Sequence, residues 1–550
     1  MDSSLDALAP RPHREGAVRR PFADVPSDAR PYAVRMRDGV RLATDVYLPT
    51  GRAPWPVLLS RLPYDKAGDE CFMPAIAHWF NERGYAVVVQ DVRGKIRSGG
   101  ELEPFRFELT DGYDTIDWIT EQDWSTGAVG MFGDSYFGWT QWAAASSQHQ
   151  ALRAIAPRVI SADIGDVVTR GGQFRLEMMG LWALETWVDE YLYGYEDTVD
   201  WSARPLSEVV PQALSGRRSE FLDRLAQEGV PESGQLSVRG DVPALHLGGW
   251  WDIVRDGQLD TWRRAAAAGK APQFLVMDAV DHGWTRLRTP GEPYVDPSAD
   301  PSAMSAFLED YLGPLVPFFD HYLAGSGAYD APPVRWMLTH AGWQADAEWP
   351  PERSVPIDWH LTGDRRGLLS PTPEEREQVV EWIQEPDDLV PSLAHAYHPL
   401  VEPADDRALD DRGDVLIFHS DPLPYSLDLA GPVSLTASCD SSSPDARIMV
   451  SLCDLTPDGS ALRIVDGVAA VESRAPLTVR LGDTGYRVRA GHRLRLQVSA
   501  SEFPRYLPDT GTGDDSWTAT EFLATHHRVV IGGERGARLQ CFAIPARGDD

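Results

Sequence analysis

The sequence predicts an α/β protein with a helical insertion and a C-terminal all-β domain, and three observations lead to this prediction. Apolar runs alternate with helical stretches over residues 31–160 and 241–331, as in a doubly wound sheet. Over residues 161–240 the alternation gives way to a helical pattern. Over residues 332–550, strand-like segments recur between Gly, Pro and Asp turns, which is typical of a jelly roll or other β-sandwich.

The predicted sheet begins with a hairpin and continues with buried strands. Residues 1–30, rich in Ala, Pro, Arg and Asp, are expected to form a flexible leader. The Asp38-Gly39 pair between two alternating segments predicts a β-hairpin. Downstream, the pattern predicts strands at 56–60, 85–90, 128–132 and 152–156 and helices at 75–83, 112–120 and 139–148.

The insertion at 161–240 is expected to form a cap over the sheet, because helical spacing over 173–193 and 220–227 replaces the strand pattern. The α/β alternation then resumes with strands at 242–247 and 273–277, a helix over 254–268 and a last helix over 302–323. The strands expected beyond it include 355–361, 415–418, 433–436 and 494–498.

The composition restricts the partners of the protein. Asp and Glu number 83 against 51 Lys and Arg, for a net charge of −32, so neither nucleic acid nor an anionic membrane is an expected partner. The N-terminus has no signal-type apolar run, and no stretch is long and apolar enough to cross a membrane. The 4 cysteines have no metal-ligand spacing and are expected to be reduced thiols. A cytoplasmic protein without a metal or cofactor is the expectation.

The strongest local motif is Gly-Asp-Ser-Tyr-Phe-Gly at 133–138, between a predicted strand and a predicted helix. A nucleophile elbow needs small residues there because the turn is sharp and the strand and helix pack closely. The spacing departs from Gly-x-Ser-x-Gly, since the second glycine comes one residue later. The amide of Tyr136 would point at a developing oxyanion, at the N-terminus of the helix. We therefore predict an α/β-hydrolase core with Ser135 as the nucleophile.

A nucleophilic serine needs a base and an orienting carboxylate, which in this fold follow later strands in the order Ser, Asp, His. Asp252 follows the predicted strand that ends in Leu-Gly-Gly-Trp-Trp, and His282 follows the next strand within Asp-His-Gly. The rivals Asp256 and Asp260 lie inside a predicted helix. We predict Asp252 and His282 as the partners of Ser135.

Together these motifs resemble the family of cocaine esterase, X-Pro dipeptidyl-peptidase and α-amino-acid ester hydrolase. The matching segments, in order, are 61–66 (RLPYDK), 91–94 (DVRG), 98–100 (SGG), 133–142 (GDSYFGWTQW), 248–252 (GGWWD), 281–283 (DHG), 503–506 (FPRY) and 510–512 (TGT). The resemblance covers residues 30 to 545 approximately and implies an α/β-hydrolase core, a helical cap and a jelly-roll domain. It also implies that the phenol of Tyr64 donates to the oxyanion beside the Tyr136 amide.

The acyl pocket is expected to be apolar and aromatic. Members that act on α-amino acyl groups carry acidic residues just after the catalytic Asp, whereas Ile253-Val254-Arg255 follows here, and Arg255 would repel an ammonium group. The candidate substrate-binding side chains are aromatic: Phe174, Trp182 and Trp251, with Trp187, Tyr191 and Tyr193 as further cap aromatics. We therefore expect benzoyl or phenylacetyl esters to be preferred over acetyl esters.

The sequence thus predicts a serine hydrolase that cleaves a small-molecule ester through an acyl-enzyme. Three alternatives stay open at this point. One is an X-Pro dipeptidyl-peptidase or another amidase, and the second is an acyltransferase or cyclase in a biosynthetic pathway. The third is a non-catalytic binding protein derived from a decayed hydrolase. A homodimer is possible, but no residue decides the oligomeric state.

Overall fold

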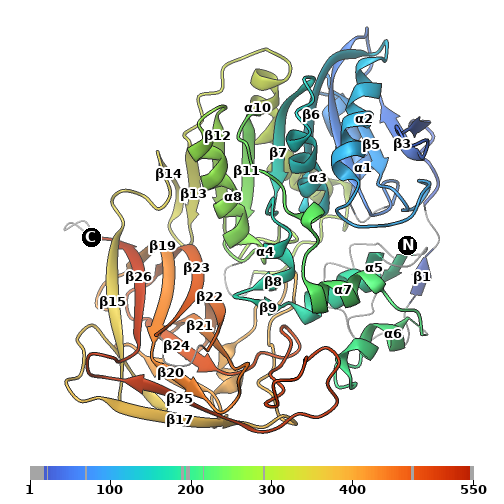
Figure 1. Cartoon of the computed structure of the whole chain (residues 1–550). Helices are drawn as coiled ribbons and strands as arrows, with labels where there is room; N and C mark the ends of the chain where they lie inside the picture. Colours follow the sequence, from blue (N-terminus) through green and yellow to red (C-terminus); the bar gives the residue numbers. More distant parts are fainter. Residues whose placement is uncertain are drawn as a thin grey trace.

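The computed structural model describes residues 18–20, 23–68, 71–186, 191–193, 199–214, 216–288, 292–471 and 476–545. Figure 1 shows a large α/β layer, an all-β domain beside its lower end, and a group of short helices below α3. The α/β-hydrolase core, the helical cap and the C-terminal all-β domain that the sequence predicts are therefore confirmed.

The α/β layer is built on a ten-stranded sheet that is parallel from β5 to β13. Its spatial order is β14-β13-β12-β11-β7-β6-β4-β5-β3-β2, and β2, β3 and β14 are antiparallel to their neighbours. The strands are β2 (Arg30–Arg35), β3 (Arg41–Tyr47), β4 (Trp55–Leu62), β5 (Ala86–Asp91), β6 (Ser125–Asp134), β7 (Leu152–Arg158), β11 (Ala244–Gly249), β12 (Gln273–Asp278), β13 (Val334–Leu338) and β14 (Gly342–Asp346). The sheet therefore extends to Asp346, so the boundary predicted between residues 331 and 332 is too early.

Helices cover both faces of this sheet. One face carries α1 (Met73–Asn81), α9 (Pro301–Leu312) and α10 (Leu315–Tyr322), and the other carries α2 (Glu108–Thr120), α3 (Ser135–Ser146) and α8 (Arg255–Ala268). Leu58 and Leu59 of β4 belong to different hydrophobic clusters, because successive side chains of a strand point to opposite faces. The single helix predicted over 302–323 is wrong: Gly313-Pro314 divides it, and Pro314 has no N–H to continue a helix.

The cap lies between β7 and β11. Its elements are α4 (Gly165–Val168), β8 (Thr169–Arg170), β9 (Gln173–Phe174), α5 (Leu176–Thr186), β10 (Tyr191–Tyr193), η3 (Leu206–Glu208), α6 (Val209–Ala213), α7 (Glu220–Glu228) and η4 (Glu232–Gly234). The helix predicted over 173–193 is therefore shorter than expected, and Trp187 lies outside the described residues. β10 pairs with β1 (Val18–Arg20), so this part of the expected flexible leader is a strand.

The all-β domain contains a nine-stranded sheet and a three-stranded sheet. Its strands are β15 (Val355–Thr362), β16 (Arg366–Ser370), β17 (Gln378–Gln384), β18 (Leu416–His419), β19 (Leu427–Ala437), β20 (Cys439–Ser441), β21 (Arg447–Leu455), β22 (Ala461–Ala470), β23 (Leu477–Val488), β24 (Arg493–Ser499), β25 (Thr525–Ile531) and β26 (Arg538–Ile544). The edge strands β22 and β23 approach each other so closely that a Cβ at Gly467 would lie 2.1 Å from the Arg480 carbonyl oxygen. The sheet is therefore nearly closed around its apolar core.

The two parts of the molecule are in close contact. In the turn between β8 and β9, a Cβ at Gly171 would lie 1.8 Å from the Val468 carbonyl oxygen of β22.

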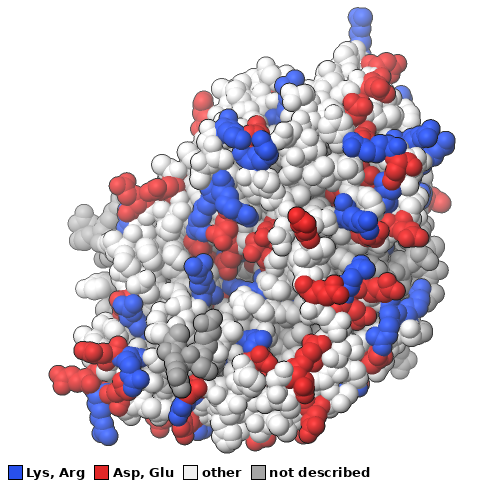
Figure 2. Space-filling view, in the orientation of Figure 1, with Lys and Arg blue, Asp and Glu red and all other residues white. Residues whose placement is uncertain are grey.

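On the face drawn in Figure 2, basic and acidic side chains are interspersed. Within the ranges described above, no helix is long and apolar enough to cross a membrane. No disulfide bond links any of the four cysteines, all of which lie in the described ranges.

Candidate active site

The nucleophile elbow forms where β6 ends and α3 begins. Ser135 has a φ of 47°, in the left-handed region that a side chain rarely adopts. Gly133 has a φ of 135°, and a Cβ there would lie 2.1 Å from the Phe137 ring. A Cβ at Gly138 would lie 2.7 Å from Ile160. The later second glycine is therefore explained by packing, because the Phe137 side chain folds back over Gly133 and Gly138 meets the chain that follows β7.

Three side chains form one hydrogen-bonded chain at this turn. His282 Nε2 lies 3.1 Å from Ser135 Oγ, and His282 Nδ1 lies 2.7 Å from Asp252 Oδ1. Asp252 follows β11 and is buried, whereas His282 follows β12 and is 12% exposed. The structure therefore brings together the three residues that the sequence nominates as nucleophile, base and orienting carboxylate.

Asp281 holds the loop that carries His282. Its buried carboxylate accepts the backbone N–H groups of Gly283 at 3.1 Å and Thr285 at 2.9 Å, which shapes the turn around the imidazole. The second carboxylate oxygen accepts the N–H of Leu400 at 3.1 Å, from the segment between β17 and β18. Burial raises the pKa of Asp281 to about 7, although these N–H groups oppose that shift. The histidine loop is thus tied to the all-β domain.

Tyr64 lies on the loop after β4, on the wall of the cavity that Ser135 also lines. Trp182 Nε1 of the cap donates a hydrogen bond to the Tyr64 hydroxyl oxygen at 3.2 Å. Burial raises the pKa of Tyr64 well above its usual range, and nearby Glu185 raises it further. The phenol therefore keeps its proton at neutral pH and is able to donate a hydrogen bond to an anion.

The backbone amide and the phenol of Tyr136 have different contacts. Its N–H lies in the first turn of α3, where amide groups have no partner within the helix. Its hydroxyl donates to the buried Glu108 carboxylate and accepts the N–H of Phe105 at 3.1 Å. The phenol is thus occupied by the core, and only the amide is available to an oxyanion.

A large open cavity of about 430 Å³ lies on one side of Ser135. Its wall combines aromatic rings with charged groups. The side chains on it include Tyr64, Phe72, Trp182, Glu185, Trp284, Arg288, Tyr294, Val295 and Phe307. Asp134 also lines this cavity, but Tyr311 donates to its carboxylate and Arg158 lies 3.4 Å away. The cavity has room for a bulky group with both apolar and polar parts.

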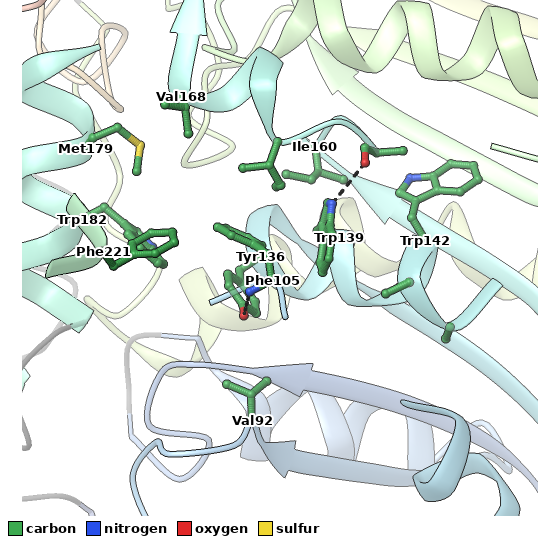
Figure 3. Close-up of a cluster of buried hydrophobic side chains, with 14 of the residues drawn as sticks. Val92, Phe105, Tyr136, Trp139, Trp142, Ile160, Val168, Met179, Trp182 and Phe221 are labelled. Atoms are coloured by element: carbon green, nitrogen blue, oxygen red, sulfur yellow. Dashed lines mark hydrogen bonds between the residues drawn. The ribbon is translucent and has the colours of Figure 1, made fainter. Parts of the chain in front are cut away.

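A second, apolar cavity of about 40 Å³ lies on the other side. Ser135, Trp182, His282 and Tyr397 line both cavities. The rest of the small cavity is formed by apolar side chains and Tyr136: Phe105, Tyr136, Ile160, Ile164, Val167, Val168, Met178, Met179, Ile253 and Val254. Figure 3 shows Met179, Val168 and Trp182 on the cap side, facing Tyr136 and Ile160. This cavity suits a compact, uncharged group.

Two of the three predicted substrate-binding aromatics lie elsewhere. Phe174 is buried against Trp517, with ring centroids 6.1 Å apart, because β9 packs on the C-terminal chain. Trp251 donates from Nε1 to the Arg463 carbonyl oxygen at 3.0 Å, so its ring faces the all-β domain. Among the described residues that line the two cavities, Trp182 is the only one of the three predicted substrate-binding aromatics.

Arg255, which was expected to repel an ammonium group, does not line either cavity. Arg255 is buried and donates to Asp256 Oδ1 at 2.7 Å and to the carbonyl oxygens of Trp250 and Leu481, away from both cavities. It cannot repel a group bound there. Ile253 and Val254 do line the small cavity, where the described wall carries no carboxylate. An ammonium group bound in the small cavity would therefore have no carboxylate on the described wall as its counter-charge.

Tyr397 and His398 also line the large cavity and were not predicted from the sequence; both come from the segment between β17 and β18. The Tyr397 hydroxyl donates to the Met178 carbonyl oxygen at 2.5 Å, and its ring centroid lies 5.9 Å from that of His282. Burial lowers the pKa of His398, which keeps this imidazole neutral on the cavity wall. No local pattern marks these residues. The described chain also has no cluster of His, Cys, Asp and Glu that would hold a metal ion.

Comparisons with known proteins cover both parts of the chain. Residues 38–284 match the X-Pro dipeptidyl-peptidase (S15) family, and residues 326–540 match the X-Pro dipeptidyl-peptidase C-terminal non-catalytic domain. The cocaine esterase of Rhodococcus sp. (strain MB1 Bresler) is 30% identical over 534 residues, covering 87% of this chain and 92% of that protein. A putative serine esterase of Mycobacterium bovis (strain ATCC BAA-935 / AF2122/97) is 26% identical over 586 residues, covering 85% and 90%.

Two solved structures share the fold of the whole chain. An aminopeptidase from the marine sediment archaeon Thaumarchaeota archaeon has a TM-score of 0.79 at 23% identity, covering 96% of this chain and 99% of its own. An α-amino acid ester hydrolase has a TM-score of 0.77 at 24% identity, covering 95% and 98%.

Proposed function

The chain belongs to the X-Pro dipeptidyl-peptidase (S15) family of serine hydrolases, and we propose that Ser135 is the nucleophile with which it cleaves carboxylic esters. The observation that carries the proposal is His282, whose two ring nitrogens lie 3.1 Å from Ser135 Oγ and 2.7 Å from Asp252 Oδ1. Two of its relatives, described in the preceding section, are named as esterases, which supports an ester as the substrate.

The reaction proceeds in two acyl-transfer steps. His282 takes the hydroxyl proton as Ser135 Oγ attacks the ester carbonyl carbon, and Asp252 holds the imidazole in the required tautomer. The Tyr64 hydroxyl and the Tyr136 amide donate hydrogen bonds to the oxyanion of the tetrahedral intermediate. The C–O bond to the alcohol breaks as the alcohol oxygen receives the proton from His282. Water, activated by the same histidine, then hydrolyses the acyl-enzyme and regenerates the Ser135 hydroxyl.

The two cavities are assigned to the two halves of the ester. The alcohol must leave while the acyl group is still bonded to Ser135, and the large cavity of about 430 Å³ is the more open of the two. The acyl group stays behind in the apolar cavity of about 40 Å³. We therefore propose an uncharged, compact acyl group with a bulkier alcohol. This proposal keeps the apolar acyl pocket of the sequence prediction, although aliphatic side chains form much of its wall. It does not keep the expected preference for benzoyl and phenylacetyl over acetyl esters, because a cavity of about 40 Å³ suits a compact group.

Peptidase activity is the second candidate, since the matched family is named for X-Pro dipeptidyl-peptidases. Such enzymes hold a free N-terminal ammonium. The absence of a carboxylate on the described wall of the small cavity favours esters over these peptides. Acyl transfer to an amine or alcohol would use the same three residues and is distinguished by its product. The hydrogen-bonded chain of Ser135, His282 and Asp252 supports an active enzyme over a decayed hydrolase.

The composition of the chain supports a proposal for its cellular compartment and its partners. Four cysteines without a disulfide bond support a reducing compartment such as the cytoplasm. A net charge of −32 supports a small-molecule substrate over nucleic acid. Analytical ultracentrifugation distinguishes a monomer from a homodimer.

Covalent labelling tests the proposed function. A fluorophosphonate probe should label wild-type protein at Ser135, located by mass spectrometry, and should not label the folded variant Ser135→Ala. Labelled enzyme should lose the ability to hydrolyse p-nitrophenyl esters, and ester hydrolysis should exceed that of X-Pro p-nitroanilides. Absence of an adduct on folded wild-type protein would reject Ser135 as an activated nucleophile and favour the decayed hydrolase.

A further inference from the structure

The segment that ends β4 and turns toward the active site presents a single side chain to the large cavity. Over residues 61–68, Tyr64 is partly exposed and the other residues are buried. Asp65 and Lys66, which follow it, do not line the cavity and are bonded to other parts of the chain. A functional side chain on a loop depends on the residues around it for its position. The contacts of these neighbours therefore decide where the phenol of Tyr64 lies.

Lys66 is a buried cation held by two strands of the sheet. Its side chain and that of Asp91 are both 0% exposed. Lys66 Nζ donates a hydrogen bond to Asp91 Oδ2 at 2.6 Å and lies 3.5 Å from Asp45 Oδ2. Asp91 ends β5 and Asp45 lies on β3, which pairs with β5, so the lysine ties the loop to both strands. Burial raises the pKa of Asp91 to about 6 against the opposing effect of Lys66, so above that pH the carboxylate pairs with the ammonium.

Asp65 holds the same loop at a second point. One of its carboxylate oxygens accepts the N–H of Ala67 at 3.1 Å, and the other accepts the N–H of Ala23 at 2.6 Å. The first bond shapes the turn that follows Tyr64, and the second joins this turn to the segment before β2. The loop is thus fixed on the side of the sheet, away from the cavity.

A buried ion pair is better suited to fixing geometry than to adding stability. Removing two charges from water costs about as much free energy as their attraction returns, and apolar side chains of similar volume are often as stable in their place. A hydrogen bond between charged groups, however, fixes a distance and a direction. An oxyanion donor needs such precision, because it must lie about 2.7–3.1 Å from the oxyanion and a displacement of about 1 Å can cost about 10²-fold in rate.

We propose that Lys66 is a positioning residue for Tyr64, whose bond to Asp91 fixes the loop so that the phenol meets the oxyanion. Lys66 lines neither cavity at Ser135, so it acts through Tyr64 and not by contact with the substrate. Trp182 holds the same phenol from the cap, at 3.2 Å. The proposal rests on the role proposed above for Tyr64 in the esterase reaction.

A double-mutant cycle between Lys66 and Tyr64 is the test. Lys66→Met removes the charge and keeps an unbranched side chain. We expect it to lower kcat for p-nitrophenyl esters by about 10- to 100-fold, with a much smaller change in KM. In the Tyr64→Phe background the same change should lower kcat by less than about 2-fold, because the donor that it positions is already absent. Equal losses in the two backgrounds, or full kcat in folded Lys66→Met, would overturn the proposal.

Tyr85→Phe is the matched control for a general loss of stability. The Tyr85 hydroxyl is buried and donates to Asp320 Oδ1 at 2.5 Å. It immediately precedes β5, at the opposite end of that strand from Asp91. Its loss should lower Tm and leave kcat unchanged. If Tyr85→Phe lowers kcat as much as Lys66→Met does, the effect of Lys66 is one of stability alone and the positioning role is rejected.

Asp91→Asn keeps the proposal testable where Lys66→Met does not fold. The amide removes the charge of the partner but retains an oxygen that accepts a hydrogen bond from Lys66. We expect a smaller loss in kcat, about 3- to 10-fold, because a neutral acceptor holds the ammonium less firmly. This loss must also disappear in the Tyr64→Phe background, and a loss that persists there would contradict the proposal.

The failures are distinguishable. If wild-type protein is neither labelled at Ser135 nor active on esters, the proposed function itself fails. If wild-type protein is labelled and Tyr64→Phe retains full kcat, Tyr64 is not the oxyanion donor, and the role of Lys66 is rejected while the esterase stands. If Tyr64→Phe is impaired but the losses at Lys66 and Tyr64 multiply, the positioning role of Lys66 alone fails.

Discussion

The two cavities that meet at Ser135 differ in size, wall chemistry and origin. The large one, of about 430 Å³, has aromatic and charged side chains on its wall, many of them from the segments around residues 282–311. The small one, of about 40 Å³, is almost wholly apolar and is closed by the cap. An ester has two unequal halves, and only one of them stays bonded to the enzyme after the first step. The difference therefore indicates which half each cavity receives.

The largest expected effect concerns the two tyrosines, one on each cavity. Tyr64→Phe removes the phenolic donor to the oxyanion and should lower kcat by about 10²–10³-fold, for acetyl and benzoyl esters alike. Tyr136→Phe is the matched control: its hydroxyl is occupied by Glu108 and Phe105, while its amide is unchanged. It should therefore retain most of kcat and lose stability. Steady-state kinetics with p-nitrophenyl esters decides, and equal losses in kcat would contradict the assignment.

A smaller effect is expected from enlarging the apolar cavity. Met179 is buried on its wall, so Met179→Ala should raise kcat/KM for longer or bulkier acyl chains relative to acetyl by about 10-fold, at a cost of about 2–5 kcal/mol in stability. Val295→Ala alters an exposed side chain of the large cavity and should leave the acyl preference unchanged. A series of p-nitrophenyl esters measures both. A shift in acyl preference with Val295→Ala but not Met179→Ala would reverse the assignment of the cavities.

The smallest effect concerns Asp281, which holds the loop of His282 and so the wall common to both cavities. Its carboxyl has a pKa of about 7 when folded, against about 3.9 when unfolded. Between these values the folded state keeps a proton that the unfolded state has lost, so this group's contribution to stability falls as pH rises. Asp281→Asn cannot ionise. Its Tm relative to wild type should therefore be higher at pH 8 than at pH 5, and a difference independent of pH would contradict this.

The chemistry of the site could be predicted because its signals are local. Ser135 lies in a six-residue motif whose glycines the elbow needs, and Asp252 and His282 follow successive strands in the order that this fold requires. Strand and helix periodicity likewise placed most elements of the α/β layer. Tyr64 could be nominated only through the family resemblance, because a tyrosine after a strand has no distinctive spacing.

What could not be predicted depends on contacts between distant segments. Tyr397 comes 115 residues after His282, as their numbers show, and nothing near it in sequence marks a cavity wall. The strand Val18–Arg20 exists because it pairs with Tyr191–Tyr193. Phe174 and Trp251 are aromatic residues in suitable segments, but their packing partners lie in the C-terminal domain. A local sequence pattern shows which side chains a segment carries, but it does not show which distant residues those side chains will contact.

The hydrogen bond from the Leu400 N–H to Asp281 also determines when the histidine loop is secured during synthesis of the chain. Ser135, Asp252 and His282 are all translated before the segment that secures the histidine loop. A ribosome adds about 5–20 residues per second, so the nascent chain carries Ser135 for roughly 13–53 seconds before Leu400 is added. We therefore expect the histidine loop to take its final position only late in translation.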